Sequence, residues 1–227
     1  MSRLLAERAY EALKRDIISC KLRPGQAIVE TELASTYGMS KTPIREALNL
    51  LRKEGFVQIL PRRGTLVKPI DVTDVQHTFL LRMLLEPEAA ALAAVRATGA
   101  QLRQLRELAT ATESSGARAV SEQRDLLRAN RLFHVAIAEA SGVSRLAAVI
   151  ASLHEEIERF YNAERPRVPG APVGKHHHDL LEALVAGDAD LARSLMVERI
   201  RASRQHLIDA IIGEPGVAGL SVVDRSA

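Results

Sequence analysis

The 227 residues carry a formal net charge of +3, divided between a basic excess in the first 70 residues (13 Lys and Arg against 7 Asp and Glu) and an acidic excess after them (18 against 21). Their 47% hydrophobic content excludes a disordered chain, the single Cys20 excludes an intrachain disulfide or a cysteine-based zinc finger, and 3% aromatics without Trp argue against base stacking on single strands. Without an apolar run of roughly 20 residues or an apolar leader, we expect a cytoplasmic protein with no membrane partner.

The first predicted element is an amphipathic helix over residues 3–19, which ends before the turn pair Pro24-Gly25. A short strand is expected over 27–30. Thr31 is expected to cap the next helix and Gly38 to end it, after which Ser40 caps a further helix. In that helix the apolar residues share one face and the polar residues form a stripe on the other: Ile44, Ala47, Leu48 and Leu51 against Lys41, Arg45, Asn49 and Arg52.

Two short helices separated by the turn at residues 38–40 predict a helix-turn-helix, whose second helix enters the major groove of DNA. Residues 57–60 and 65–67 then read as two strands, joined by Pro61, Arg62, Arg63 and Gly64. This hairpin predicts a basic wing that touches the DNA backbone or the minor groove.

The run PGQAIVETELASTYGMSKTPIREALNLLRKEGFVQILPRRGTLV resembles the winged helix-turn-helix of the GntR family of bacterial regulators, with a match over about residues 5–69. The resemblance implies DNA contacts from the second helix, the wing and the first helix: Lys41, Thr42, Arg45, Arg62, Arg63 and Thr31. Lys41 stands where Arg is commoner in the family, and Thr31 where some members place a DNA-contacting Arg. A lysine cannot form the rigid bidentate fork of arginine, so the contact of Lys41 is expected to favour phosphate.

From Asp71 onward the pattern is helical throughout. It predicts an antiparallel bundle of six to seven helices near 73–97, 100–113, 119–140, 144–162, 174–186 and 188–211, the first kinked at Pro87. Residues 162–173 predict an exposed loop. The expected fold is therefore mostly α: a winged helix-turn-helix over 1–70, an all-α helical domain over 71–213 and a loose tail over 214–227.

Polar residues occupy helical positions where apolar ones are expected, namely Arg82, Glu86, Asn130, His134, His177 and Arg199. Asn130 and His134 are four residues apart and share a helix face. His177 and Arg199 lie ten and twelve residues on either side of Gly187, so in an antiparallel helix pair they are expected to face each other. Together these residues predict a polar chamber inside the bundle, where ligands and metals are commonly bound.

Three runs in this part of the chain, RMLLEPEAAALAA, NRLFHVAIAEASG and HHDLLEALVAGDADLARSLM, are similar to the FCD ligand-binding domain of the FadR subfamily. The resemblance implies a divalent metal such as zinc, held by an Asp or Asn, a His four residues later and two further His, together with a small organic acid effector. The metal ligands would then be Asn130, His134 and His177. The fourth position falls on Arg199, which has no lone pair to give to a metal.

Two alternatives follow from this departure. In one, Asn130, His134 and His177 hold a metal with open positions. In the other, no metal is bound and Arg199 with Arg82 clamps a carboxylate directly, which is favoured because a metal cation and a guanidinium repel each other. The effector-binding residues are in either case predicted to be Arg82, Asn130, His134, His177 and Arg199, with the choice between His177 and His178 left open by the pattern.

The sequence therefore predicts a regulator that binds a palindromic double-stranded operator as a homodimer, with an affinity set by a small carboxylic acid. One alternative is a constitutive DNA-binding regulator with a vestigial chamber. Another is a metal-dependent hydrolase fused to a winged helix. The chain offers no activated nucleophile, no HExxH motif and no Gly-rich phosphate loop, so we expect that it is not an enzyme.

Overall fold

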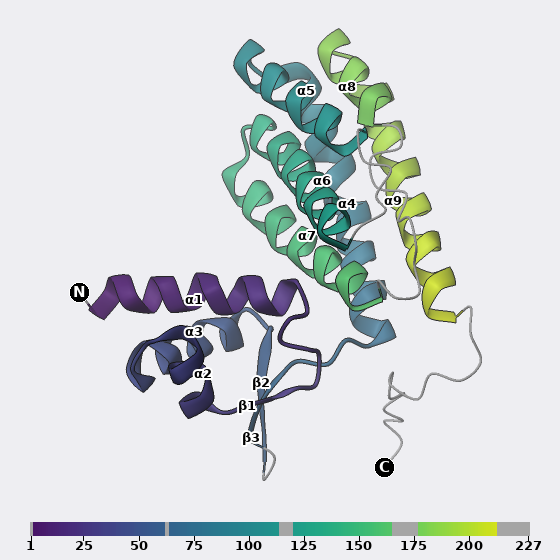
Figure 1. Ribbon diagram of the computed structural model, residues 1–227. Coiled ribbons are helices and arrows are strands. Elements are labelled where there is room, and N and C mark those ends of the chain that lie inside the picture. Colours follow the sequence, from purple (N-terminus) through teal and green to yellow (C-terminus); the bar gives the residue numbers. More distant parts are fainter. Residues whose placement is uncertain (1, 62–63, 114–119, 165–176, 213–227) are drawn as a thin grey trace. The chain divides into compact units, whose positions relative to one another are not determined.

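The computed structural model describes residues 2–61, 64–113, 120–164 and 177–212, and these are mostly helical (Figure 1). The chain divides into two compact units, Met1–Asp71 and Val72–Ala227. In neither unit does a helix of the described ranges combine the length and the apolar character needed to cross a membrane.

The N-terminal unit contains three helices and three short strands: α1 (Ser2–Ile18), β1 (Ala27–Ile28), α2 (Glu30–Tyr37), α3 (Lys41–Lys53), β2 (Val57–Leu60) and β3 (Gly64–Val67). The strands form one antiparallel sheet in the order β1-β3-β2. Val57 pairs with Val67 and Leu60 with Gly64, so β2 and β3 form the predicted hairpin of a wing. The predicted winged helix-turn-helix is therefore confirmed.

The core of this unit lies between α1, α3 and the sheet. Its buried residues recur at helical spacing on α1 (Ala9, Leu13 and Ile17) and on α3 (Ile44, Ala47, Leu48 and Leu51), and the sheet adds Ile28, Val57 and Val67. Burial of these aliphatic side chains fixes which way α3 is turned. Its opposite, polar face consequently lies in solvent.

The two predicted helix caps differ from the structure in detail. The prediction that Thr31 caps α2 is wrong, because Val29 is the extended cap residue and its carbonyl already accepts the Leu33 N–H at 3.1 Å, which places Thr31 in the first helical turn. Ser40 occupies the cap position of α3 but makes no side-chain cap bond within the described part of the chain. Gly38 ends α2 as predicted, with the left-handed φ of 63° that glycine tolerates.

The C-terminal unit is a bundle whose described residues form six helices: α4 (Val72–Arg96), α5 (Gly99–Glu113), α6 (Val120–Ala140), α7 (Ser144–Glu164), α8 (His177–Ala186) and α9 (Ala189–Ile212). α4 contacts α6, α7, α8 and α9, and it continues as one helix through Pro87. Small buried side chains on α4, among them Ala89, Ala90 and Ala93, let the neighbouring helices approach closely. The predicted all-α bundle is confirmed.

The helix ends correct one predicted loop. α7 extends to Glu164, so residues 162–164 are helical rather than part of a loop, whereas residues 165–173 lie outside the described residues. The helix predicted from 174 is described from His177, and the predicted tail 214–227 is also outside the described range. Gly187, with a φ of 72°, turns the chain between α8 and α9 as its spacing predicts.

Candidate functional site

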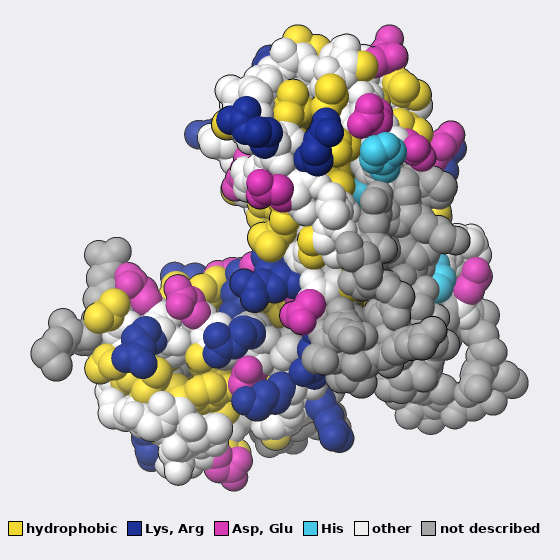
Figure 2. Space-filling model, turned by 45° about the horizontal axis from the view of Figure 1, so that its top comes forward, with side chains coloured by type: hydrophobic (Ala, Val, Ile, Leu, Met, Phe, Trp, Pro, Cys, Tyr) yellow, Lys and Arg dark blue, Asp and Glu magenta, His cyan; other side chains and the backbone are white. Residues whose placement is uncertain are grey.

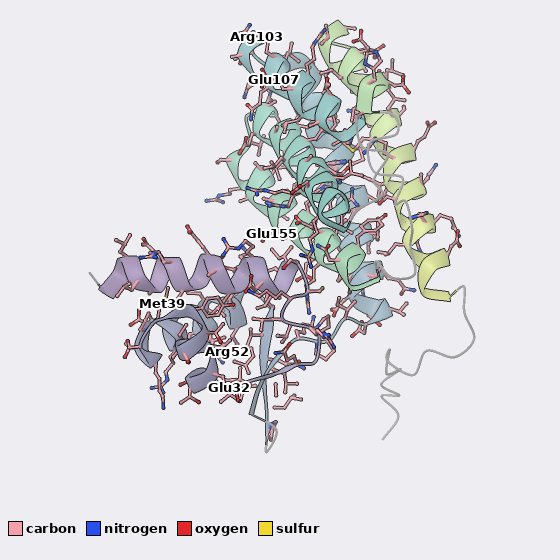
Figure 3. All side chains as sticks on the ribbon, in the orientation of Figure 1. Glu32, Met39, Arg52, Arg103, Glu107 and Glu155 are labelled. Atoms are coloured by element: carbon pink, nitrogen blue, oxygen red, sulfur yellow. The ribbon has the colours of Figure 1, made fainter. Side chains whose placement is uncertain are left out.

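The outer face of α3 is exposed and polar. Lys41, Thr42 and Arg45 all lie in solvent in the first turns of this helix, directly after the turn that holds Met39 (Figure 3). In the space-filling view, Lys and Arg side chains gather over the N-terminal unit (Figure 2). A cationic helix face of this kind, displayed after a tight turn, fits the major groove and its flanking phosphates.

Arg45 is held by a carboxylate of the preceding helix. Its Nη2 donates to Glu30 Oε2 at 2.8 Å and its Nε to both carboxylate oxygens at 3.2 Å, which is a forked, two-armed contact between α3 and α2. The hydrogen bond lowers the pKa of Glu30 and raises that of Arg45. Because the Arg45 side chain is 64% exposed, the guanidinium is oriented by Glu30 and still open to a ligand from solvent.

The other predicted DNA contacts are placed only in part. Thr31 is exposed in the first turn of α2. Arg62 and Arg63, predicted at the tip of the wing, lie outside the described residues.

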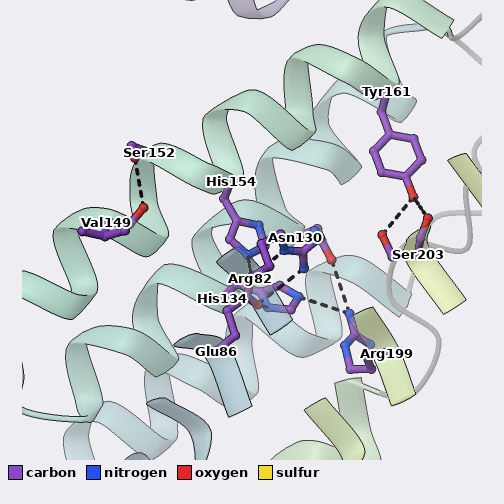
Figure 4. Close-up of polar contacts among 10 residues, drawn as sticks. All are labelled: Arg82, Glu86, Asn130, His134, Val149, Ser152, His154, Tyr161, Arg199 and Ser203. Atoms are coloured by element: carbon purple, nitrogen blue, oxygen red, sulfur yellow. Dashed lines mark hydrogen bonds and ion pairs between the residues drawn. The ribbon is translucent and has the colours of Figure 1, made fainter. Parts of the chain in front are cut away.

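A second site is a group of side chains in the C-terminal unit, called here the polar cluster (Figure 4). Its members come from α4, α6, α7, α8 and α9, and they are Arg82, Glu86, Asn130, His134, His154, His177 and Arg199. The Glu86 carboxylate accepts from Arg82 Nε, from His134 Nδ1 at 2.8 Å and from His154 Nε2 at 3.0 Å. Because an ionised carboxylate only accepts hydrogen bonds, both imidazoles direct an N–H at Glu86.

These contacts determine the charge of the cluster. Burial opposes ionisation of Glu86, but Arg82, His154 and His134 outweigh it and hold the pKa of the carboxyl well below its ordinary value. Burial also lowers the pKa of His134 and of His154, so both imidazoles are neutral near pH 7. Burial and then the charge of Arg82 lower the pKa of Arg199 to about 10, which leaves it protonated. The cluster thus contains two cations and one anion.

Arg199 faces a group of neutral acceptors. Its Nη2 lies 2.6 Å from His177 Nε2, 3.3 Å from His134 Nε2 and 3.5 Å from Asn130 Oδ1. The other ring nitrogen of His177, Nδ1, contacts the hydroxyl of Thr112 on α5. The structure therefore brings Arg199 and His177 together across the turn at Gly187, as their spacing predicts.

The polar cluster includes all five residues that the sequence predicts as effector contacts. His177 is buried and His178 exposed, which settles the register of α8. Sequence reasoning missed His154 and Thr112. Both carry a signal that could have found them: His154 shares a helical stripe with Ile150 and Ile157, and Thr112 shares one with Leu105 and Ala109.

Within the described residues, Arg82 Nη1 and His154 Nδ1 are among the buried polar atoms that have no hydrogen-bond partner. A buried donor without an acceptor is costly, typically by about 1–3 kcal/mol. Glu86, His134 and His154 also place ligand-type atoms within 4.8 Å of one another, a group that could hold a metal ion. The cluster thus offers an unmet donor for an anion and a candidate set of metal ligands.

Both parts of the chain match known families. Residues 5–67 match the model of the bacterial regulatory proteins of the gntR family, and residues 77–202 match the FCD domain. The chain is 30% identical over 193 residues to the HTH-type transcriptional regulator McbR of Escherichia coli, covering 82% of this chain and 85% of McbR. It is 26% identical over 196 residues to the transcriptional repressor RspR of the same organism, covering 86% and 85%.

The same relationship is visible in three dimensions. The solved structure of E. coli McbR/YncC aligns with a TM-score of 0.79 at 27% identity, over 91% of this chain and 98% of that one. A GntR-type putative regulator from Rhodococcus aligns with a TM-score of 0.74 at 21% identity, over 92% and 99%. The second likeness supports the fold alone.

Proposed function

The chain belongs to the GntR family of bacterial regulators and carries an FCD domain, and on that basis we propose that a small organic acid, bound by the polar cluster, changes its affinity for a DNA operator. DNA-binding transcriptional regulation itself follows from the family, whose named relatives here are transcriptional regulators and not enzymes. The effector, its class and the residues that bind it are the proposal.

For DNA, Arg45 is the residue that reads a base edge. The forked contact with Glu30 orients a guanidinium that can donate two hydrogen bonds to guanine in the major groove. Lys41 and Thr42 sit one turn earlier, where phosphate contacts set the register of the helix on the duplex. The wing arginines and Thr31 remain predicted contacts.

For the effector, the observation that carries the proposal is the Arg82 guanidinium. It is 2% exposed and already donates to Glu86, yet its Nη1 has no acceptor among the described side chains and backbone. A carboxylate placed against this nitrogen would satisfy the donor and add a second negative charge to a cluster of two arginines and one glutamate. A ligand bound there contacts several helices at once and so can shift their packing.

We also propose that the regulator acts as a homodimer on a palindromic operator, because two-fold sites are read by two-fold proteins. The support in the structure is a row of large apolar side chains in solvent on α4: Leu80, Leu81 and Leu84. Adjacent exposed leucines mark contact surfaces, and a second copy of α4 would cover them. Sedimentation velocity tests this, since Leu84→Glu is expected to convert a dimer to a monomer.

A thermal-shift titration tests the effector. Acetate, lactate, succinate and citrate are added singly to the full chain, and at least one is expected to raise the melting temperature in a concentration-dependent way. Arg82→Gln should abolish that shift, whereas Arg193→Gln, which removes an exposed arginine of α9, should keep it. If none of the acids shifts the wild-type protein, or if Arg82→Gln responds as the wild type does, the effector proposal fails.

Coupling to DNA is tested with the same acid. Binding of the acid and of the operator are thermodynamically linked. If the acid changes the dissociation constant for the operator by some factor, the operator must change the dissociation constant for the acid by the same factor and in the same direction. Fluorescence anisotropy of a labelled operator, with and without the acid, measures the first change, and calorimetry of the acid with and without operator measures the second. An acid that binds but leaves operator affinity unchanged contradicts the proposal.

A further inference from the structure

Three lone-pair atoms of the polar cluster converge on one point. They are Asn130 Oδ1 and His134 Nε2 on α6, and His177 Nε2 on α8, and each is within 3.5 Å of the same nitrogen of Arg199. Two imidazole nitrogens and an amide oxygen around one point are the donor set of a divalent-metal site. The geometry therefore describes a place built for a cation.

The two imidazoles are prepared for that cation by their other ring nitrogens. His134 Nδ1 donates to the Glu86 carboxylate, so its Nε2 carries the lone pair. The Thr112 hydroxyl donates to the Ala109 carbonyl at 2.6 Å and is left to accept from His177 Nδ1, so His177 Nε2 carries a lone pair as well. Such hydrogen bonds on the far nitrogen are how proteins orient histidine toward a metal.

The cation at that point is the guanidinium of Arg199. It comes from α9, and its Nη2 directs its two N–H groups toward the two Nε2 atoms and the amide oxygen. A metal ion needs these ligands at about 2.0–2.2 Å, which would put it in contact with a fixed positive charge. The residues present therefore do not fit a metal at this point.

The second candidate set, Glu86 with His134 and His154, is also engaged. Its carboxylate already accepts from both imidazoles and from Arg82. A metal there requires His134 Nδ1 to give up its proton to Nε2, which would set an N–H against the donors of Arg199. Arg199 thus opposes metal binding at both sets, because His134 is common to them.

We infer that Arg199 is a built-in replacement for a metal ion, and that the cluster binds its organic anion without any metal, through the guanidinium groups of Arg199 and Arg82. This inference rests on the proposed effector site and specifies its chemistry. The anion is bound by forked hydrogen bonds from the two guanidinium groups and not by coordination to a metal ion, so its binding is insensitive to chelators. It also means that one substitution can convert the site into a metal site.

Zinc titration of the full chain, freed of any affinity tag and stripped with EDTA, tests the inference. Wild-type protein is expected to show no rise in melting temperature with Zn²⁺ and to keep no zinc through gel filtration. Arg199→His supplies a fourth ligand beside Asn130, His134 and His177, and is expected to keep about one zinc per chain and to melt at a higher temperature with Zn²⁺. Adding His177→Gln should remove that gain.

Two controls keep the outcome clear. His178 is exposed beside the site, so His178→Gln in both backgrounds identifies zinc held at the surface. If Arg199→His does not fold, Arg199→Ala removes the guanidinium and leaves the three lone pairs open, and it is expected to bind zinc more weakly. The titration needs neither acid nor DNA, so its result is separate from the test of the proposed function.

The inference is overturned if wild-type protein retains zinc that His134→Gln or His177→Gln abolishes. It is equally overturned if folded Arg199→His, with wild-type circular dichroism, shows no zinc-dependent shift. Chelator offers a further check, because an acid that stabilises the wild type should give the same shift with and without EDTA.

Discussion

Replacing Glu86 by glutamine should strongly destabilise the C-terminal unit. Glu86 is 1% exposed and is the acceptor for Arg82, His134 and His154. Glutamine keeps the shape but removes the negative charge, which leaves the Arg82 guanidinium, 2% exposed, without a counter-ion. Removing one partner of a buried ion pair costs about 3–5 kcal/mol, a large share of the roughly 5–15 kcal/mol by which domains are stable.

Glu88, two residues further along the same helix, is the matched control. It also pairs with an arginine, at 2.8 Å from Arg193, but its side chain is 57% exposed and that of Arg193 39%. Water screens such a pair and solvates either partner when the other is removed. Glu88→Gln is therefore expected to change the stability by no more than the error of the measurement.

Urea denaturation followed by circular dichroism at 222 nm compares the two variants with the wild type. The transition of the C-terminal unit should move to a much lower urea midpoint for Glu86→Gln, with a similar slope, and stay in place for Glu88→Gln. A loss below about 1 kcal/mol for Glu86→Gln, or equal losses for both variants, would refute the view that an ionised, buried Glu86 holds the cluster together.

Three further predictions concern the recognition helix, pH and the turn. Glu30→Gln removes the carboxylate that pairs with Arg45 and so frees the guanidinium for phosphate. The logarithm of the DNA affinity should then fall more steeply with the logarithm of the salt concentration, by about one unit of slope, and discrimination between operator and random DNA should weaken. An unchanged slope in fluorescence-anisotropy titrations would contradict this role of Glu30. Burial lowers the pKa of the three histidines of the polar cluster, so the unfolded chain takes up protons at a higher pH than the folded one. The free energy of unfolding should therefore decrease as the pH drops below about 6.5, by up to about 1.4 kcal/mol per pH unit for each histidine. Coinciding urea midpoints at pH 7.5 and pH 5.5 would contradict this. Gly38→Ala places a Cβ on a residue whose backbone φ is 63°, and it should lower the free energy of unfolding of the N-terminal unit by about 1 kcal/mol in the same denaturation assay. A variant as stable as the wild type would show that this backbone conformation causes no strain.

Periodicity predicted most of the fold, because burial of one face is a local property of each segment. The apolar stripe of α3 and the glycines at 38 and 187 determined which helices exist, where they end and which face of α3 is polar. The prediction for Thr31 failed because the cap is the last residue with extended backbone before the helix. That residue is Val29, two positions before Thr31, and residue type alone does not locate it.

The candidate sites were predictable only where spacing linked their residues. His177 and Arg199 could be paired because both are measured from one turn. His154 joins Glu86 from 68 residues away, and Arg45 joins Glu30 across two helices, and such long-range partners depend on how the helices pack rather than on any local pattern. Membership of the cluster therefore had to come from the structure.

Selection of bound fragments from a pool of random duplexes by the full chain tests most directly that this protein reads DNA through α3. The account predicts enrichment of one two-fold symmetric sequence by the wild type. Arg45→Ala should fail to enrich it, while Arg103→Ala, which removes an exposed arginine of α5, should enrich it normally. The account would be contradicted if folded wild-type protein enriched no sequence from the pool, or if Arg45→Ala enriched the same sequence as the wild type.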